Sequence, residues 1–163
     1  MDRLWAPWRL SYVASAKPAN ERDACFICSG LAQDKDREHL IAWRGPKSVV
    51  VLNRFPYNNG HLLVAPRAHK ASLHELDADE TLEMQQMLAR LATILGDMMK
   101  PDGFNIGLNL GKAAGAGLPG HLHWHIVPRW QGDTNFMPVV ADTRVIVQSL
   151  ESFYTLLTER IKN

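Results

Sequence analysis

The chain contains five short stretches rich in apolar residues, two of which alternate with polar positions, and these predict five β-strands. The alternation is strictest over residues 104–110, where four apolar side chains share one face and Asn or Gly residues share the other. Turns rich in Gly, Pro and Asn separate the first three stretches, as expected for hairpin connections. We expect strands at 40–43, 48–53, 61–65, 104–110 and 121–127.

A helical spacing of apolar residues follows Asp77. The Asp77 carboxylate can cap the helix, and Glu80 is placed to complete a capping box. The apolar stripe consists of Leu88, Leu91, Ile94, Leu95 and Met98, and the helix is expected to end at residues 100–103. A second helix is expected over 145–161, with an apolar side formed by Leu150, Phe153, Leu156, Leu157 and Ile161.

Short successive strands crossed by one long helix predict an α+β fold with a mainly antiparallel five-stranded sheet. A chain of 163 residues has the size of a single domain, which we expect to span residues 1–163. Within it we distinguish an N-terminal segment (1–38), a central region with the sheet and the long helix (39–137), and a C-terminal helical region (138–163).

The net charge is close to zero, with 18 Lys and Arg against 17 Asp and Glu. Proteins that coat nucleic acid or anionic membranes rely on a basic excess, so neither partner is expected. Apolar runs are short, as at 49–52, and the N-terminus lacks the apolar core of a secretory signal. We therefore expect a cytoplasmic protein. The unusual feature of the composition is 7 His beside 2 Cys.

The two cysteines form a Cys25-Phe26-Ile27-Cys28 pair. A structural disulfide is not expected in a reducing cytoplasm. A metal half-site is favoured over a redox dithiol, because residues 17–23 are polar and contain a proline, unlike the strand that leads into a thioredoxin-type helix. The remaining interpretation is that both cysteines are simply small apolar side chains buried in the core.

His121, His123 and His125 alternate with apolar residues in the last expected strand. On a strand they would share one face at intervals of about 6.5–7 Å. Packing does not explain this, because imidazoles buried without partners are costly. Two chemistries fit: metal binding, for which the spacing is wide, and nucleophilic catalysis by one neutral imidazole assisted by another. Exposed histidines on an edge strand are the least favoured interpretation.

A glycine-rich loop at residues 111–120 leads directly into these histidines. Its four glycines and Lys112 allow backbone amides and an ammonium group to approach an anion such as phosphate. Asn109, on the polar face of the preceding strand, can hold a phosphate or ribose oxygen. A flexible connection is the alternative, but the position beside three histidines favours phosphate binding.

The segment His121-Leu122-His123-Trp124-His125-Ile126-Val127 resembles the signature of the histidine-triad (HIT) family. Asn53 and residues 60–66 resemble the strands on the nucleoside side of the family's site. Residues 4–9, 104–111 and 128–136 are similar to the bacterial branch that cleaves diadenosine tetraphosphate by phosphorolysis or hydrolysis. The resemblance covers nearly the whole chain. It implies a HIT-like fold whose sheet continues across a homodimer.

The resemblance also implies nucleotidyl transfer through a covalent AMP–histidine intermediate. His123 is the implied nucleophile, and His125 is the implied hydrogen-bond donor to the phosphate. The implied substrate-binding residues are Asn53, His61, Asn109, Gly111, Lys112 and Gly117. Many relatives carry Ser, Thr or Gln just before the triad, whereas residues 115–120 contain none of these. Loop amides or Lys112 are the implied substitutes.

Zinc-containing branches of the family imply partners for the two cysteines. The implied ligands are Cys25, Cys28, His69 and His121, with His39 and His74 as alternatives. Two thiolates and two imidazoles make a closed tetrahedral site, so we expect one structural Zn²⁺ per chain without a catalytic role.

We therefore expect an enzyme that cleaves an adenine dinucleoside polyphosphate, most simply diadenosine tetraphosphate. A nucleoside phosphoramidate hydrolase is one alternative, and a nucleotide-binding scaffold with little turnover is another. A metalloenzyme with an open metal on the three histidines is disfavoured by the strand spacing.

Overall fold

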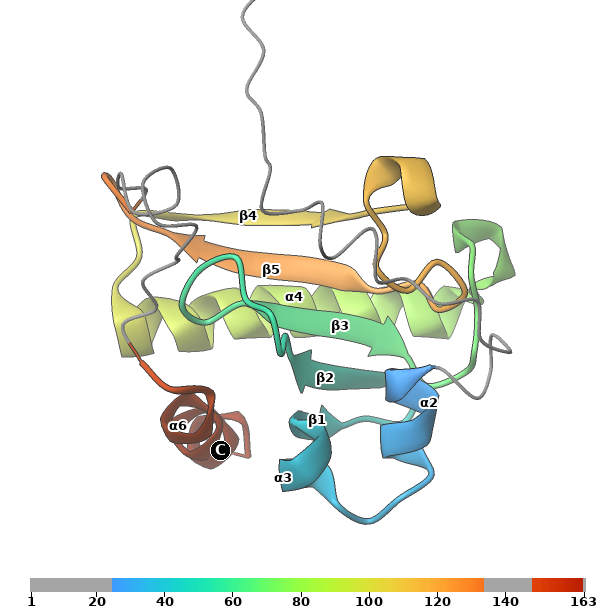
Figure 1. Cartoon of the computed structure of the whole chain (residues 1–163), viewed down its shortest axis with the longest axis horizontal. Helices are drawn as coiled ribbons and strands as arrows, with labels where there is room; N and C mark the ends of the chain where they lie inside the picture. The colour runs from blue at the N-terminus through green and yellow to red at the C-terminus, as the bar shows by residue number, and fades with distance from the viewer. Residues whose placement is uncertain (1–24, 134–147, 163) are drawn as a thin grey trace, which may run out of the picture.

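The computed structural model describes residues 25–133 and 148–162, which form a five-stranded antiparallel sheet with helices on both faces (Figure 1). The sheet order is β1-β2-β3-β5-β4. The strands are β1 (Ile41–Arg44), β2 (Ser48–Leu52), β3 (Leu62–Pro66), β4 (Gly103–Leu108) and β5 (Trp124–Arg129). The predicted α+β class is confirmed. Residues 4–9 and 134–136, which contribute to the family resemblance, lie outside the described residues.

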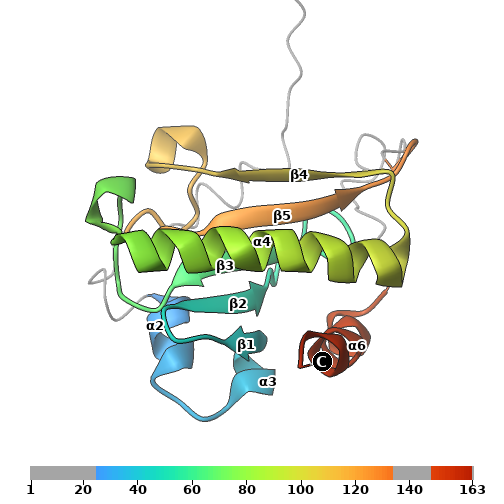
Figure 2. The ribbon, with the colours of Figure 1, turned by 180° about the vertical axis from the view of Figure 1, so that it is seen from behind.

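Helix α4 (Ala78–Met99) crosses one face of the sheet, as seen from behind in Figure 2. The predicted capping box is present: Asp77 Oδ1 accepts from the Glu80 amide at 2.7 Å, and Glu80 Oε2 accepts from the Asp77 amide at 2.8 Å. Buried leucines of α4 and the C-terminal helix α6 (Leu150–Ile161) enclose the main core with the strands. Within the described ranges, no helix is both long and apolar enough to span a bilayer.

The opposite face carries two short helices that the sequence did not predict, α2 (Phe26–Leu31) and α3 (Asp36–His39). They are too short for a helical apolar period to stand out. Ile27 of α2 packs with Val49, Leu63 and neighbouring apolar residues of β1, β2 and β3 in a second core. The cysteine pair opens a helix after all, because Cys25 Sγ accepts from the Cys28 amide at 3.4 Å and caps α2.

Strand β5 begins three residues later than predicted, at Trp124. The amides of His121 and Leu122 donate to the carbonyls of Leu118 and Lys70 instead of a neighbouring strand, at 3.3 and 2.7 Å. Of the three histidines only His125 is therefore in the strand. The predicted row of three histidines on one strand face is wrong.

The C-terminal helix begins at Leu150, later than the predicted residue 145. Residues 145–147 lie outside the described residues, but Ser149 stops the helix from extending further back by capping it, with Oγ accepting from the Ser152 amide at 3.2 Å. The apolar side also differs from the prediction. Leu156 is 46% exposed, whereas Tyr154 is buried and its hydroxyl donates to the Ile41 carbonyl at 2.9 Å.

Strand β4 lies at an edge of the sheet. In the described part of the chain, no further strand pairs with its outer edge, and Ile106 on this strand is 47% exposed. That the sheet continues across a homodimer stays a prediction, which the molecular mass of the protein in solution tests.

Candidate active site and metal centre

Two thiols and two imidazoles converge on the sheet face opposite α4. Cys25 and Cys28 come from the start of α2, His69 follows β3, and His121 precedes β5. Their ligand atoms all lie within 4.8 Å of one another. Cys25 Sγ is 3.2 Å from His121 Nδ1, and Cys28 Sγ is 3.2 Å from His69 Nδ1. Because tetrahedral coordination with ordinary metal–sulfur and metal–nitrogen bonds separates such atoms by ~3.5 Å, the cluster fits a metal ion.

The hydrogen bond of His121 prepares it to bind a metal. Its Nε2 is 2.8 Å from the Pro66 carbonyl, which only accepts, so Nε2 carries the proton. Nδ1 then presents its lone pair to the thiols. Burial lowers the pKa of His121 to about 4, which keeps the ring in the neutral, metal-binding form. The four side chains form a possible metal site, and neither His39 nor His74 belongs to it.

His123 is held by the backbone of that same metal-site residue. Its Nδ1 is 2.8 Å from the His121 carbonyl, so Nδ1 carries the proton and Nε2 has a bare lone pair. Burial lowers the pKa of His123, which favours the neutral ring. A neutral imidazole with an unprotonated nitrogen is the form that attacks an electrophile.

A chain of hydrogen bonds fixes the proton of His125. The Tyr57 amide donates to His61 Nδ1 at 3.0 Å, so only Nε2 of His61 can carry a proton. That Nε2 is 2.9 Å from His125 Nδ1, which therefore accepts and leaves the His125 proton on Nε2. Nε2 of His125 is buried without a hydrogen-bond partner among the described residues. The ring centroids of His123 and His125 are 5.0 Å apart, so the nucleophilic nitrogen of one ring lies near the N–H donor of the other.

These assignments predict the behaviour of His125 in an imidazole NMR titration. Burial, with a smaller contribution from His123, lowers the pKa of His125 to about 4. At pH 7 we expect a neutral His125 with its proton on Nε2, still neutral where an ordinary histidine titrates. The unfolded chain takes up this proton near pH 6.5 and the folded chain only near pH 4. The free energy of unfolding should therefore decrease as the pH is lowered from about 6.5 to about 4. A His125 proton on Nδ1, or titration near pH 6.5, would contradict the arrangement.

Two of the expected nucleotide-binding residues, Asn53 and His61, lie beside the expected catalytic histidines. Asn53 and His61 are in contact, with Asn53 Nδ2 3.3 Å from His61 Nδ1, and His61 reaches His125. Asn53 Oδ1 accepts from the Phe55 amide at 2.9 Å, so one end of this amide shapes the turn after β2.

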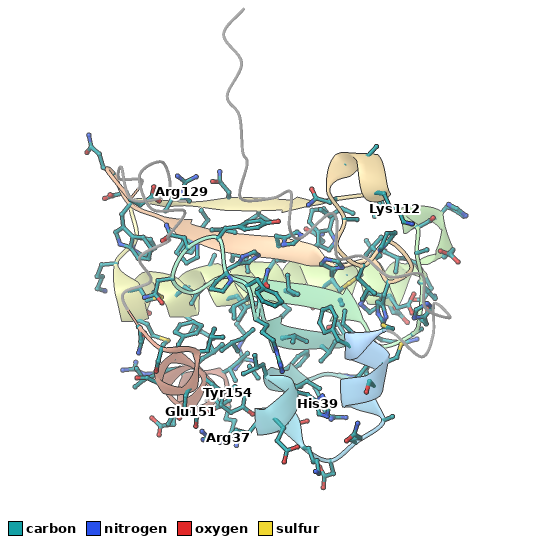
Figure 3. All side chains as sticks on the ribbon, viewed as in Figure 1. Arg37, His39, Lys112, Arg129, Glu151 and Tyr154 are labelled. Carbon is teal, nitrogen blue, oxygen red and sulfur yellow. The ribbon has the colours of Figure 1, made fainter. Side chains whose placement is uncertain are left out.

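The other four expected binding residues, Asn109, Gly111, Lys112 and Gly117, lie between β4 and the histidines in the chain. Lys112 is exposed on the 3₁₀ turn η3 (Lys112–Ala114), at the opposite end of the sheet from Arg129 (Figure 3). Gly111 and Gly117 are exposed, and Asn109 directly follows β4 and is partly buried. Gly111 has a φ of 78°, which suits a glycine. In the described residues no hydrogen bond joins Lys112 to the histidines, so its binding role stays a prediction.

Tyr57 was missed by the sequence analysis. Its ring centroid lies 4.6 Å from that of His61 and 5.9 Å from that of His125, and it is nearly parallel to the latter at 20°. It is 47% exposed, so it forms a wall between these imidazoles and solvent. The only sequence signal is an aromatic residue inside a turn of Pro, Asn and Gly.

Comparison with known proteins gives matches along most of the chain. The family model described as HIT domain matches residues 35–132. The AP-4-A phosphorylase of Mycobacterium tuberculosis is 37% identical over 161 residues, which cover 96% of this chain and 83% of that protein. An adenosine 5'-monophosphoramidase of Saccharomyces cerevisiae is 30% identical over 129 residues, 79% of this chain and 77% of that protein.

Solved structures share the fold. A Zn-bound histidine triad family protein from Mycobacterium smegmatis has a TM-score of 0.69 at 25% identity, covering 86% of this chain and 95% of that one. A hypothetical histidine triad nucleotide-binding protein from Sulfolobus tokodaii has a TM-score of 0.67 at 27% identity, covering 85% and 93%. The resemblance carried by residues 121–127 is thus confirmed over sequence and fold together, and the chain belongs to the HIT family.

Proposed function

We propose that the protein cleaves diadenosine tetraphosphate through an AMP–histidine intermediate on His123. The observation that carries the proposal is the bare Nε2 of His123 beside the N–H donor of His125, each set by its own hydrogen bond. The choice of substrate is supported by the 37% identity to an AP-4-A phosphorylase. Asn53 and His61 on one side, and Asn109, Gly111, Lys112 and Gly117 on the other, are proposed to line the nucleotide site.

In the first step His123 Nε2 attacks the α-phosphorus. A nitrogen–phosphorus bond forms while the bond to the bridging oxygen breaks, and ATP leaves. The His121 carbonyl stabilises the positive charge that develops on the His123 ring, because it accepts the Nδ1 proton. His125 Nε2–H donates to a phosphate oxygen, where negative charge is concentrated in the transition state.

In the second step an acceptor oxygen attacks the same phosphorus and returns His123 to its starting form. Inorganic phosphate as the acceptor gives ADP, and water gives AMP. We propose phosphate, since the glycine-rich loop offers backbone amides and Lys112 to a second anion. Dividing one displacement into two keeps each attack in line with its leaving group.

Product analysis tests this proposal. Purified protein is incubated with diadenosine tetraphosphate, with and without inorganic phosphate, and the nucleotides are separated. We expect ATP plus ADP, with ³²P-phosphate incorporated into the β-position of ADP. ATP plus AMP would replace phosphorolysis with asymmetric hydrolysis, and two molecules of ADP would contradict attack at the α-phosphorus. Absence of turnover while nucleotide binds would favour a binding protein.

Phosphoramidate hydrolysis is the second candidate, favoured by the 30% identity to an adenosine 5'-monophosphoramidase. Such a substrate loses an amine instead of ATP from the same α-phosphorus. The loop before the triad lacks a Ser, Thr or Gln side chain that would assist a polyphosphate leaving group. Comparing kcat/KM for adenosine 5'-phosphoramidate and diadenosine tetraphosphate decides between them.

We propose that the metal is zinc, with Cys25, Cys28, His69 and His121 as its ligands. Two sulfur and two nitrogen donors in a closed tetrahedral arrangement suit Zn²⁺, and one structural neighbour at 25% identity is a Zn-bound protein. Bound zinc would supply a rigid crosslink between α2 and the segment before β5. Thiolate ligands persist in a reducing compartment, which is consistent with the cytoplasm.

A further inference from the structure

The backbone that carries the nucleophile is held outside the sheet. Pairing between β3 and β5 extends only from Leu62 with Ile126 to Val64 with Trp124, so it stops short of His123. Beyond that point the chain is fastened to the segment that follows β3. Leu122, whose side chain is 2% exposed, donates its amide to the Lys70 carbonyl at 2.7 Å. The position of His123 therefore depends on the position of Lys70.

Lys70 is in turn fastened to the start of α4. Its Nζ is 2.6 Å from Glu80 Oε2, and their side chains are only 23% and 6% exposed. The same carboxylate oxygen accepts the Asp77 amide in the capping box, so it cannot follow Lys70 if the loop moves. This buried ion pair lies at the end of the molecule where α2 and the N-terminus of α4 are found, at the left in Figure 2.

We propose that Lys70 and Glu80 are positioning residues for the nucleophile: their ion pair fixes the Lys70 backbone, which holds Leu122 and thereby the His123 ring. The proposal rests on the proposed function, in which His123 attacks phosphorus. Neither side chain is among the residues that we propose to bind the nucleotide or the metal. Its contribution is rigidity, because a shift of about 1 Å in a reacting group costs up to ~100-fold in rate.

The chain provides a matched control. Lys47 Nζ lies 3.3 Å from Asp77 Oδ2, in a second Lys–carboxylate pair at the same helix N-terminus. Its side chains are 44% and 51% exposed. Exposed pairs contribute little, and Lys47 has no hydrogen bond to the nucleophile segment among the described residues, so its loss should leave catalysis unchanged.

The test compares the double variant Lys70→Met/Glu80→Gln with Lys47→Met. Replacing both partners leaves no unpaired buried charge, and Gln can still accept from the Asp77 amide, so the double variant is expected to fold and to keep its metal. We expect kcat for diadenosine tetraphosphate to fall about tenfold or more at nearly unchanged KM, with Lys47→Met within twofold of wild type. The single variant Lys70→Arg, which keeps a positive charge beside an intact Glu80, should retain most of the wild-type kcat.

A second readout does not depend on the substrate. The Nδ1–H signal of His123 reports its hydrogen bond to the His121 carbonyl, and it should shift or broaden in the double variant but not in Lys47→Met. A folded, metal-loaded double variant with wild-type kcat and an unchanged His123 signal would overturn the inference. If the wild type cleaves no dinucleotide, the proposed function fails, and the His123 signal alone decides the positioning role.

Discussion

His123→Ala is expected to lower kcat for diadenosine tetraphosphate cleavage by about 10⁴-fold, with KM changed little. The side chain provides the attacking Nε2, and no other described imidazole combines a bare nitrogen with the same place in the site, since His125 Nε2 is protonated in the derived arrangement. Removing a covalent nucleophile has effects of this size or larger. The measurement is single-turnover and steady-state kinetics on the purified variant.

The matched control is His74→Ala, which removes an exposed imidazole from the 3₁₀ turn η2 (Leu73–Glu75) and should leave kcat unchanged. Mass spectrometry after acid-free quenching should find AMP attached to the wild type and not to His123→Ala. The His123 variant should keep its fold and metal, because its imidazole is not among the four clustered ligand atoms. Turnover within tenfold of wild type would exclude the covalent route through His123.

Much of the fold follows from local patterns in the sequence. Helix α4 has 22 residues, long enough for the helical spacing of its apolar residues to be recognised, and Asp77 and Glu80 mark its start. The strand at 103–108 follows from alternation, and the strand at 48–52 follows from a short apolar run between turn residues. α2 was missed because six residues carry no measurable helical period and its cap is a cysteine thiol, which is not a usual capping group.

The site shows where local patterns stop being sufficient. Alternation at 121–127 is typical of a strand, yet the amides of His121 and Leu122 find their acceptors in Leu118 and Lys70. A sequence pattern does not indicate which carbonyl an amide meets across 52 residues. The position of the ring proton on His121, His123 and His125 is not predictable from sequence for the same reason. Each is set by a hydrogen bond to a backbone carbonyl or to a side chain from another part of the fold.

Removal of the metal is expected to have the largest effect on stability. Chelation of the wild type, or the double variant Cys25→Ser/Cys28→Ser, should lower the free energy of unfolding by roughly 4 kcal/mol, the linkage value for a ligand present at about a thousand times its dissociation constant. For a chain of this size that corresponds to a Tm lower by about 10 °C. Metal analysis should give about one zinc per chain in the wild type and none in the double variant.

The control is His39→Ala, which removes a partly buried histidine on α3 outside the cluster and should keep the metal. Zinc retained after loss of both thiols would show that the ligand set is wrong. The effect on catalysis should follow the effect on structure, because His121 uses its ring in the metal cluster and its carbonyl to hold the His123 proton. Without the metal, the His121 ring loses its bond to the ion and keeps its hydrogen bond from Nε2 to the Pro66 carbonyl, so the ring is held less firmly and kcat should fall as the His123 signal broadens. An immediate loss of activity with an unchanged His123 signal and unchanged Tm would instead assign the metal a direct part in the reaction.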